Sequence, residues 1–359
     1  MKQYNINELR ARLQIHFNWN YYRVKFLTQF ITSLILSSTV NLARLSLHYN
    51  TDIKHKSNYR SIQRFFKIFA IDYVEYMYFV LKQIPKKEKF YLVMDRTNWK
   101  FGQSPINILM LGIIYKKQCF PFCWELLDKG GSSSTSERKA LLSKAMSVLG
   151  KDRILGLLCD REFIGISWFK YLIGQDIEFH IRVPKQLKVG SVLAKNRKTI
   201  NWLFRYWKEN VKIDYPKQIL ILGYKLWVSS MKSNKGYCVI VSSKDNISSL
   251  EKYQLRWTIE NMFGAFKTRG FNFEDTHMKD LTKIKKLIVL VSLAYIWCIL
   301  VGLWVSQSIK IRIAKHGRKE KSIFRVGLDF LTIFIKKLLA FEIYNPFEFK
   351  DVINLLSCT

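Results

Sequence analysis

Two short runs of apolar residues, each ending in an aspartate, stand out in the hydrophobic pattern. Residues 90–94 are followed by Asp95, and residues 154–159 are followed by Asp160. Apolar runs of this length, bounded by charged residues, predict buried strands. An acid at the carboxyl end of a buried strand lies at the rim of the sheet, where functional sites collect. One such aspartate alone is more often a turn or cap residue, so the pair carries the argument.

The pattern around these runs predicts an α/β arrangement. Three strands that would pair antiparallel come first, then a helix, the Asp160 strand, a second helix and a last strand. The helix that follows the third strand would begin at Ser134 or Thr135, after a loop of glycines and serines. The expected strands are 90–94, 106–115, 119–127, 154–159 and 177–183, with helices near 135–148 and 164–173.

A third acid lies in a segment with helical periodicity. A helix advances about 100° per residue, so Tyr253, Arg256, Glu260 and Lys267 fall within roughly 60° of one another. A carboxylate flanked by cations and a phenol suits a metal-dependent phosphoryl-transfer site on DNA. A solvated amphipathic helix is the alternative interpretation of this stripe on its own. The opposite face is apolar: Leu255, Ile259, Met262 and Phe266.

Together, the stripe and the two aspartates resemble a known signature. The chain resembles the DDE transposases of bacterial insertion sequences, family four, which carry a Y-(2)-R-(3)-E-(6)-K signature that the four stripe residues match. The resemblance covers roughly residues 55–305. In that family the first acid lies in a D-x-T-x-W context and the second in D-R-x-F. The matching residues are Asp95, Thr97 and Trp99, and Asp160, Arg161 and Phe163.

The resemblance implies a fold and a reaction. The fold would be a ribonuclease-H-like α/β core with a β-rich insertion, with the first two acids on adjacent strands. Asp95, Asp160 and Glu260 would hold two Mg²⁺ ions, or Mn²⁺ in their place, and cleave DNA, form a hairpin and transfer the strand. Tyr253, Arg256 and Lys267 would bind phosphates near the cut end. The residues themselves support only metal-dependent phosphoryl transfer.

The resemblance also implies partners, a location and a division of the chain. The partners would be double-stranded DNA with terminal inverted repeats, target DNA and a second copy in a homodimer, in the bacterial cytoplasm at the nucleoid. No membrane is expected to take part. The expected regions are a helical DNA-binding domain (1–80), a first core segment (81–183), a β-rich insertion (184–247), a second core segment (248–308) and a C-terminal helical region that would dimerise (309–359).

Two further groups of residues are candidates for DNA contact. A helix capped by Ser57 or Asn58 would pack Ile62, Phe65 and Phe66 inward and expose three polar side chains. A tryptophan of the expected insertion would stack on a base, by the resemblance, although each is more often a core aromatic. The exposed polar residues would be Arg60, Gln63 and Arg64, and the tryptophans are Trp202, Trp207 and Trp227.

Charge and cysteine content agree with a DNA-binding protein inside the cell. The formal net charge is +32 and the pI is about 9.9, which favours polyanionic partners. Basic residues are spread along the chain instead of forming a tail. No cysteine lies in a C-x-x-C pair or at zinc-ligand spacing from a histidine, and Cys119 and Cys123 read as core residues. Free thiols favour a reducing compartment.

One segment is also compatible with other classes of protein. Leu287–Val305 is an uncharged apolar run just long enough to span a bilayer, so a membrane-anchored basic protein is an alternative. A helix that is apolar all round can equally be the core of a large protein, and we favour that interpretation. A catalytically inactive DNA-binding relative is a second alternative. A junction resolvase would keep the acids without needing the stripe.

Overall fold

The computed structural model describes residues 6–49, 53–191, 197–234, 236–315, 317, 319–340 and 346–356. These residues form two compact units. Unit 1 comprises residues 1–86, 99–106 and 262–359, and unit 2 comprises residues 87–98 and 107–261. Both acids that end the apolar runs, and Glu260, therefore belong to unit 2.

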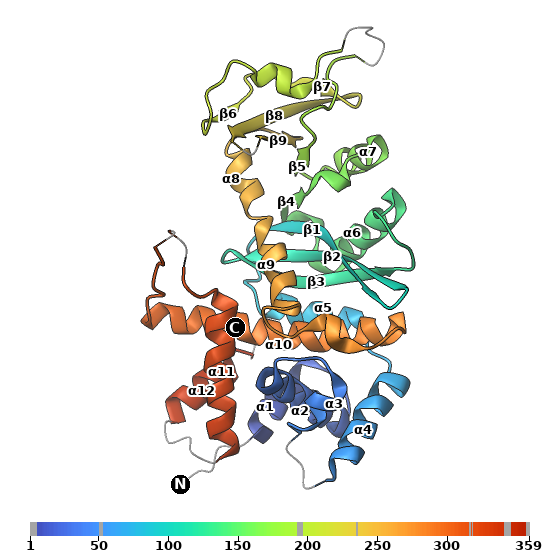
Figure 1. Ribbon diagram of the computed structural model, residues 1–359, viewed down its shortest axis with the longest axis vertical. Helices are drawn as coiled ribbons and strands as arrows, with labels where there is room; N and C mark the ends of the chain where they lie inside the picture. The colour runs from blue at the N-terminus through green and yellow to red at the C-terminus, as the bar shows by residue number, and fades with distance from the viewer. Residues whose placement is uncertain are drawn as a thin grey trace. The chain divides into compact units, whose positions relative to one another are not determined.

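Unit 2 is built on a nine-stranded mixed sheet (Figure 1). The strand order is β3-β2-β1-β4-β5-β9-β8-β6, with β7 beside β8. The α/β expectation is confirmed at this level. The strands are β1 (Phe90–Phe101), β2 (Ser104–Tyr115), β3 (Gln118–Leu127), β4 (Ile154–Cys159), β5 (Phe179–Val183), β6 (Lys212–Asp214), β7 (Ile219–Ile221), β8 (Tyr224–Ser233) and β9 (Gly236–Ser242).

The two strands that carry the aspartates are direct neighbours. β1 and β4 pair in parallel, with Val93 opposite Leu158 and Met94 opposite Cys159. All four of these side chains are fully buried. Parallel strands buried on both faces read as continuous apolar runs, which is why the two segments could be recognised in the sequence.

The predicted hairpin is also present. β2 and β3 pair antiparallel from Asn107 opposite Leu127 to Tyr115 opposite Gln118. The connecting residues Lys116 and Lys117 both have positive φ, 46° and 56°. Two consecutive residues of this kind form the tight turn whose twist matches that of the flanking strands.

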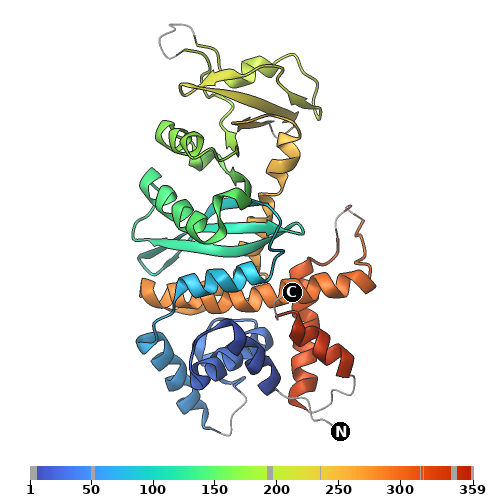
Figure 2. The same cartoon turned by 180° about the vertical axis from the view of Figure 1, so that it is seen from behind.

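Helices cover both faces of the sheet in unit 2 (Figures 1 and 2). α6 (Thr135–Leu149) and α7 (Ile166–Gly174) lie on one face, and α8 (Ser249–Gln254) lies on the other against β4, β5 and β9. α6 begins at a capping box in which the Ser134 hydroxyl accepts from the Glu137 amide and the Glu137 carboxylate accepts from the Ser134 amide. The predicted start of this helix is confirmed.

The segment expected as a β-rich insertion does form strands. β9 pairs antiparallel with β5, and β8 pairs with β9, so these strands extend the central sheet. A short 3₁₀ helix, Ile200–Phe204, precedes them.

Unit 1 is helical, as expected for the N-terminal region. α10 packs against α11, α2 and α4. Its apolar stretch is long enough to span a membrane by length and composition, and 83% of that stretch is buried inside the protein. The packing agrees with a core helix. The helices are α1 (Ile6–His16), α2 (Tyr21–Ser37), α3 (Leu42–Ser46), α4 (His55–Ile68), α5 (Tyr73–Lys82), α10 (Leu281–Ser308), α11 (Ile323–Leu339) and α12 (Pro346–Asn354).

α10 and α11 approach each other closely at two glycines. A Cβ atom added at Gly302 would overlap the carbonyl oxygen of Ile323, and one added at Gly327 would overlap that of Cys298. Glycine therefore permits backbone-to-backbone packing here. The apolar face of α11, including Leu331, is buried in this packing. The proposed dimerisation of the C-terminal region stays a prediction, but this face of α11 is already occupied within the chain.

The predicted cap of α4 is wrong. The helix begins at His55 with Lys54 at the cap position, so Ser57 and Asn58 lie inside its first turns. Asn58 is buried and its side-chain amide donates to the Ile53 carbonyl (3.4 Å) instead of capping the helix. The predicted faces of α4 are confirmed, because Ile62, Phe65 and Phe66 are buried while Arg60, Gln63 and Arg64 are exposed.

Candidate active site

Asp95 and Asp160 lie side by side at the rim of the sheet. Asp95 follows Met94 on β1, and Asp160 follows the register partner of Met94 on β4. The expected strand end at Asp95 is wrong, because β1 continues to Phe101 beyond its pairing with β4; only Asp160 directly follows the end of its strand. Both side chains are partly buried. The parallel pairing of the two strands therefore places two carboxylates next to each other, although Asp95 and Asp160 are far apart in sequence.

Arg256 connects the first acid to the third. Its Nη1 donates to Oδ2 of Asp95 (2.9 Å), and its Nη2 donates to Oε1 of Glu260. The Arg256 side chain is only 5% exposed, against 15% for Asp95 and 44% for Glu260. The planar guanidinium has donors on two edges, so it can serve two carboxylates at once.

Tyr253 reaches the second acid. Its hydroxyl donates to Oδ1 of Asp160 (3.3 Å), and the ring is buried against Ile240 and Leu250. Burial raises the pKa of Tyr253, so the hydroxyl remains a proton donor. The tyrosine and the arginine of the stripe therefore contact the two aspartates directly.

The stripe does not lie on one continuous helix, and that prediction is wrong. α8 ends at Gln254 and α9 (Trp257–Phe266) begins three residues later. At the break the Arg256 amide donates to the Tyr253 carbonyl (2.9 Å) and the Ile259 amide donates to the Arg256 carbonyl (3.1 Å). These i to i+3 bonds form a tighter turn than an α-helix. The buried ion pair of Arg256 accompanies this local change.

Asp95 is a largely buried carboxylate with several charged groups close to it. Burial raises its pKa to about 6, the nearby Asp160 and Glu162 charges act in the same direction, and the Arg256 charge and the Arg96 amide act against it. A desolvated carboxylate beside a second one is a favourable place for a cation. The donor chemistry of these two neighbouring aspartates therefore fits a hard divalent metal ion.

The three acids do not converge as they would around a metal ion. Among the residues that the structure describes, no group of three His, Cys, Asp or Glu side chains is close enough to hold one. Glu260 faces the Arg256 guanidinium, which lies between it and Asp95. A site with all three carboxylates would therefore need the Arg256 or Glu260 side chain to rotate.

Three charged residues that were not predicted from the sequence form hydrogen bonds beside the two aspartates: Arg96, Arg138 and Glu162. Arg96 forms two hydrogen bonds with the Glu162 carboxylate (3.3 and 3.2 Å) and donates to Asn107 on β2 (3.0 Å). The buried Arg138 donates to the carbonyls of Ser133 (2.6 Å) and Glu162 (3.0 Å). The repeated Asp-Arg pairs at 95–96 and 160–161 are a sequence signal that singles out Arg96, but nothing in the sequence marks Arg138.

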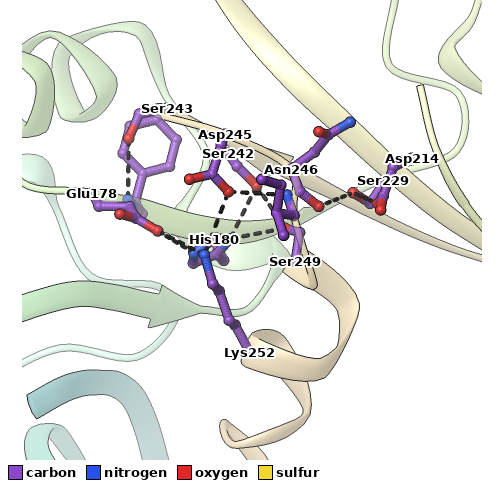
Figure 3. A network of polar contacts seen from close by, with 12 residues as sticks. Glu178, His180, Asp214, Ser229, Ser242, Ser243, Asp245, Asn246, Ser249 and Lys252 are labelled. Carbon is purple, nitrogen blue, oxygen red and sulfur yellow. Dashed lines mark hydrogen bonds and ion pairs between the residues drawn. The ribbon is translucent and has the colours of Figure 1, made fainter. Parts of the chain in front are cut away.

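A second polar cluster anchors α8 to the sheet (Figure 3). His180 on β5 is completely buried, and its Nδ1 lies 3.0 Å from the Ser242 hydroxyl on β9 and 2.8 Å from the Ser249 hydroxyl on α8. Its Nε2 lies 2.8 Å from Oε1 of Glu178. Lys252 on α8 donates to the same Glu178 oxygen (3.3 Å). Hydrogen bonds with His180 and the Lys252 charge lower the pKa of Glu178, against the effect of burial.

The cluster contains the residue types of a hydrolytic Ser-His-Glu triad. Ser242 and Ser249 are both fully buried, so no substrate reaches either hydroxyl. A nucleophilic role is excluded by this burial. The cluster instead fixes α8, and with it Tyr253, to β5 and β9.

The other predicted residues lie outside this group of contacts. Lys267 belongs to unit 1, directly after α9, and forms an ion pair with Glu274 (2.7 Å). Trp202 and Trp207 are exposed, 40% and 46%, and the Arg205 guanidinium stacks on Trp202 at 3.5 Å. Trp227 is half-buried on β8 with its indole nitrogen buried. The exposed α4 residues Arg60, Gln63 and Arg64 belong to unit 1.

The sequence of this region matches a known family. Residues 129–297 match the family model of the transposase DDE domain. This match supports a DDE transposase, an enzyme that moves a transposable element and acts on DNA. No curated protein matches the chain. The matched transposase segment contains Asp160 and the four stripe residues, while Asp95 lies before its first residue.

Proposed function

We propose that the chain is a DDE transposase of family four of the bacterial insertion sequences and carries out cut-and-paste transposition. It would bind terminal inverted repeats, cleave at their ends, form and open a hairpin, and join the 3′ end to target DNA. The observation that carries the proposal is the contact of Arg256 and Tyr253 with Asp95 and Asp160. Two signature residues thereby meet two acids that come from distant parts of the sequence.

In this proposal Asp95, Asp160 and Glu260 would hold two Mg²⁺ ions, for which Mn²⁺ can substitute, once the Arg256 or Glu260 side chain has rotated. The bound ions would lower the pKa of a nucleophilic water or 3′-hydroxyl and stabilise the leaving oxygen. The fold around the acids would be a ribonuclease-H-like core. The order β3-β2-β1-β4-β5, with β1 parallel to β4 and β4 parallel to β5, supports this assignment.

In the proposed reaction the signature residues would have two roles, to orient the aspartates and to bind phosphates. Tyr253 and Arg256 would orient the aspartates through the hydrogen bonds already present, and Arg256 would turn from Glu260 to a phosphate oxygen. Lys267 would bind a phosphate near the cut end, so Lys267→Ala is expected to weaken end binding and hairpin formation more than metal binding. Guanidinium and ammonium groups are the usual phosphate ligands of DNA-binding proteins.

The exposed aromatic side chains of unit 2 would contact the DNA end. Trp202 and Trp207 are accessible for base stacking, whereas burial of the Trp227 indole nitrogen makes it the weakest of the three candidates. Arg60, Gln63 and Arg64 on α4 would contact the inverted repeat. The active form would be a homodimer in the bacterial cytoplasm, at the nucleoid.

Cleavage of DNA that carries the gene's own flanking inverted repeats tests the proposal. Wild type should cut at the repeat boundary in Mg²⁺, and Glu260→Gln should bind the same DNA without cutting it. Glu251→Gln is the matched control, because Glu251 is an exposed acid on α8 that pairs with Lys212 away from the aspartates. Cleavage by Glu260→Gln at the wild-type rate would contradict the site assignment. Binding without cleavage by wild type would favour an inactive DNA-binding relative.

A further inference from the structure

A basic hollow lies in unit 1, outside the candidate active site. Its volume is about 750 Å³, and three segments line it: residues 41–43, one side of α4, and residues 276–283, which lead into the first turn of α10. The lining includes Gln63 but neither Arg60 nor Arg64. Its size is within the range of ligand pockets.

Polar contacts next to the hollow join the segments that line it. Nζ of Lys286, on α10, donates to the Phe66 carbonyl on α4 (2.9 Å). The Thr39 hydroxyl donates to Asp275 (3.2 Å), and the Val40 amide donates to the Phe271 carbonyl (3.0 Å). These contacts connect α4 with α10, and residues 39–40 with residues 271–275, which adjoin the lining segments.

The charge on the lining is predominantly positive. Lys67, Lys279 and Lys283 line it together with one acid, Asp280. Asp280 accepts hydrogen bonds from the Thr282 and Lys283 amides as the cap of α10 and lies 3.7 Å from the Lys283 ammonium. In the described part of the chain, no carboxylate forms an ion pair with Lys67 or Lys279. The Lys279 ammonium lies over the Phe101 ring, 5.7 Å from its centroid, which leaves its charge uncompensated by a carboxylate. Both cations therefore keep a net positive charge at the hollow for an anion.

Neutral groups of the lining complement these cations. Tyr59, Gln63 and Thr276 provide hydrogen-bonding side chains, and Phe66 provides an aromatic surface. The Thr276 hydroxyl is buried and, among the described residues, has no hydrogen-bond partner. Such a group is costly to bury unsatisfied. The α10 terminus does not by itself attract an anion, because Asp280 already accepts from its first amides.

We propose that this hollow binds the phosphodiester backbone of a DNA strand, with Lys67 and Lys279 as the ligands of neighbouring phosphates. The inference rests on the proposed function and adds a contact surface to it. The surface combines residues from the N-terminal helices with residues that follow the signature segment. A free nucleotide has the same phosphate chemistry, so the test separates the two sources.

Salt-dependent DNA binding is the direct test. A fluorescent duplex of random sequence is titrated in EDTA, which prevents cleavage, against wild type and the double variant Lys67→Ala/Lys279→Ala. Each phosphate contact contributes about 0.9 to the slope of log K against log salt. The double variant should lose about 1.8 of this slope and bind roughly tenfold or more weakly at low salt.

The matched control is Lys25→Ala/Lys310→Ala, which removes two exposed lysines of the same unit outside the hollow. Its slope should stay closer to wild type than that of the Lys67/Lys279 variant. Equal losses in both variants, or no loss in the Lys67/Lys279 variant, would overturn the proposal. Thermal melts establish that both variants are folded, which is expected because all four lysines are exposed.

Two further readouts separate the outcomes. Competition of the duplex by micromolar deoxynucleoside monophosphate would identify a free-nucleotide site and overturn the commitment to DNA. Cleavage of inverted-repeat DNA in Mg²⁺ is measured on the same samples. If the Lys67/Lys279 variant loses salt slope but wild type does not cleave the DNA, the assignment of the hollow is supported and the catalytic proposal fails. An unchanged slope with normal cleavage means that only the hollow assignment fails.

Discussion

Arg256 and Asp95 are 161 positions apart in the chain, and their side chains form an ion pair of 2.9 Å at the rim of the sheet. Both groups are largely removed from water. Breaking a buried pair by removing one partner typically costs about 3–5 kcal/mol, because an uncompensated charge is left behind. The ion pair therefore both positions the Asp95 carboxylate and contributes to the stability of unit 2.

We expect Arg256→Gln to lower the free energy of unfolding by about 3 kcal/mol. Urea denaturation measures the change. Arg325→Gln is the control, since Arg325 forms an exposed ion pair with Asp329 on α11, and such pairs contribute about 1 kcal/mol or less. Equal effects of the two substitutions would show that the Asp95 pair is not stabilising. Combining Asp95→Asn with Arg256→Gln should cost less than the sum of the single changes.

Glu178 should make stability depend on pH. Hydrogen bonds with His180 and the Lys252 charge lower its pKa in the folded protein. A carboxylate whose folded pKa is depressed stabilises the fold above its unfolded pKa, and the contribution disappears as the pH falls through the folded pKa. Glu178→Gln should therefore cost about 2 kcal/mol at pH 7. The difference from wild type should shrink below about pH 4.5. A difference that stayed constant from pH 7 to pH 3 would contradict this.

Gly327 should tolerate no side chain. A methyl group there would overlap the Cys298 carbonyl, so Gly327→Ala must push α11 away from α10. Overpacking of this kind costs about 1–3 kcal/mol. Thermal unfolding measures the loss. Gly174→Ala is the control, because nothing lies within 4 Å of an added Cβ at the end of α7; a comparable loss in both variants would refute the close approach.

The thiols should differ in reactivity with an alkylating reagent. Burial raises the pKa of Cys123 to about 12 and also raises the pKa values of Cys119, Cys159 and Cys298, so little thiolate forms at neutral pH. Cys238 is only half-buried and should react first. Mass spectrometry of the Cys358→Ser protein, which removes a residue outside the described part of the chain, measures the order. Early reaction of Cys159 would indicate that the β4 end opens.

Local patterns were sufficient to predict most of the regular elements. The strands of the aspartates were recognisable because both faces are buried, and α6 because Ser134 and Glu137 form a capping box that depends only on neighbouring residues. The cap of α4 failed because Asn58 is buried by the fold and donates to a carbonyl instead.

Features that depend on distant residues were not predictable in the same way. The break between α8 and α9 coincides with the ion pair of Arg256, whose first partner lies on β1. His180 occupies an ordinary position in a short strand, and its role appears only when β9 and α8 bring two serines to it. The hollow in unit 1 similarly combines segments separated by more than two hundred residues.

The parallel pairing of β1 and β4 has a consequence for synthesis of the protein. Asp95 and Asp160 become neighbours only after β4 has left the ribosome, and Arg256 and Glu260 follow about a hundred residues later. At about 5–20 residues per second, the nascent chain spends roughly ten to thirty seconds with Asp95 made and its arginine partner absent. Premature termination anywhere in this interval yields a fragment without the assembled carboxylate group. Such a fragment keeps the N-terminal helices and both aspartates once β4 is made, but it lacks Arg256 and Glu260.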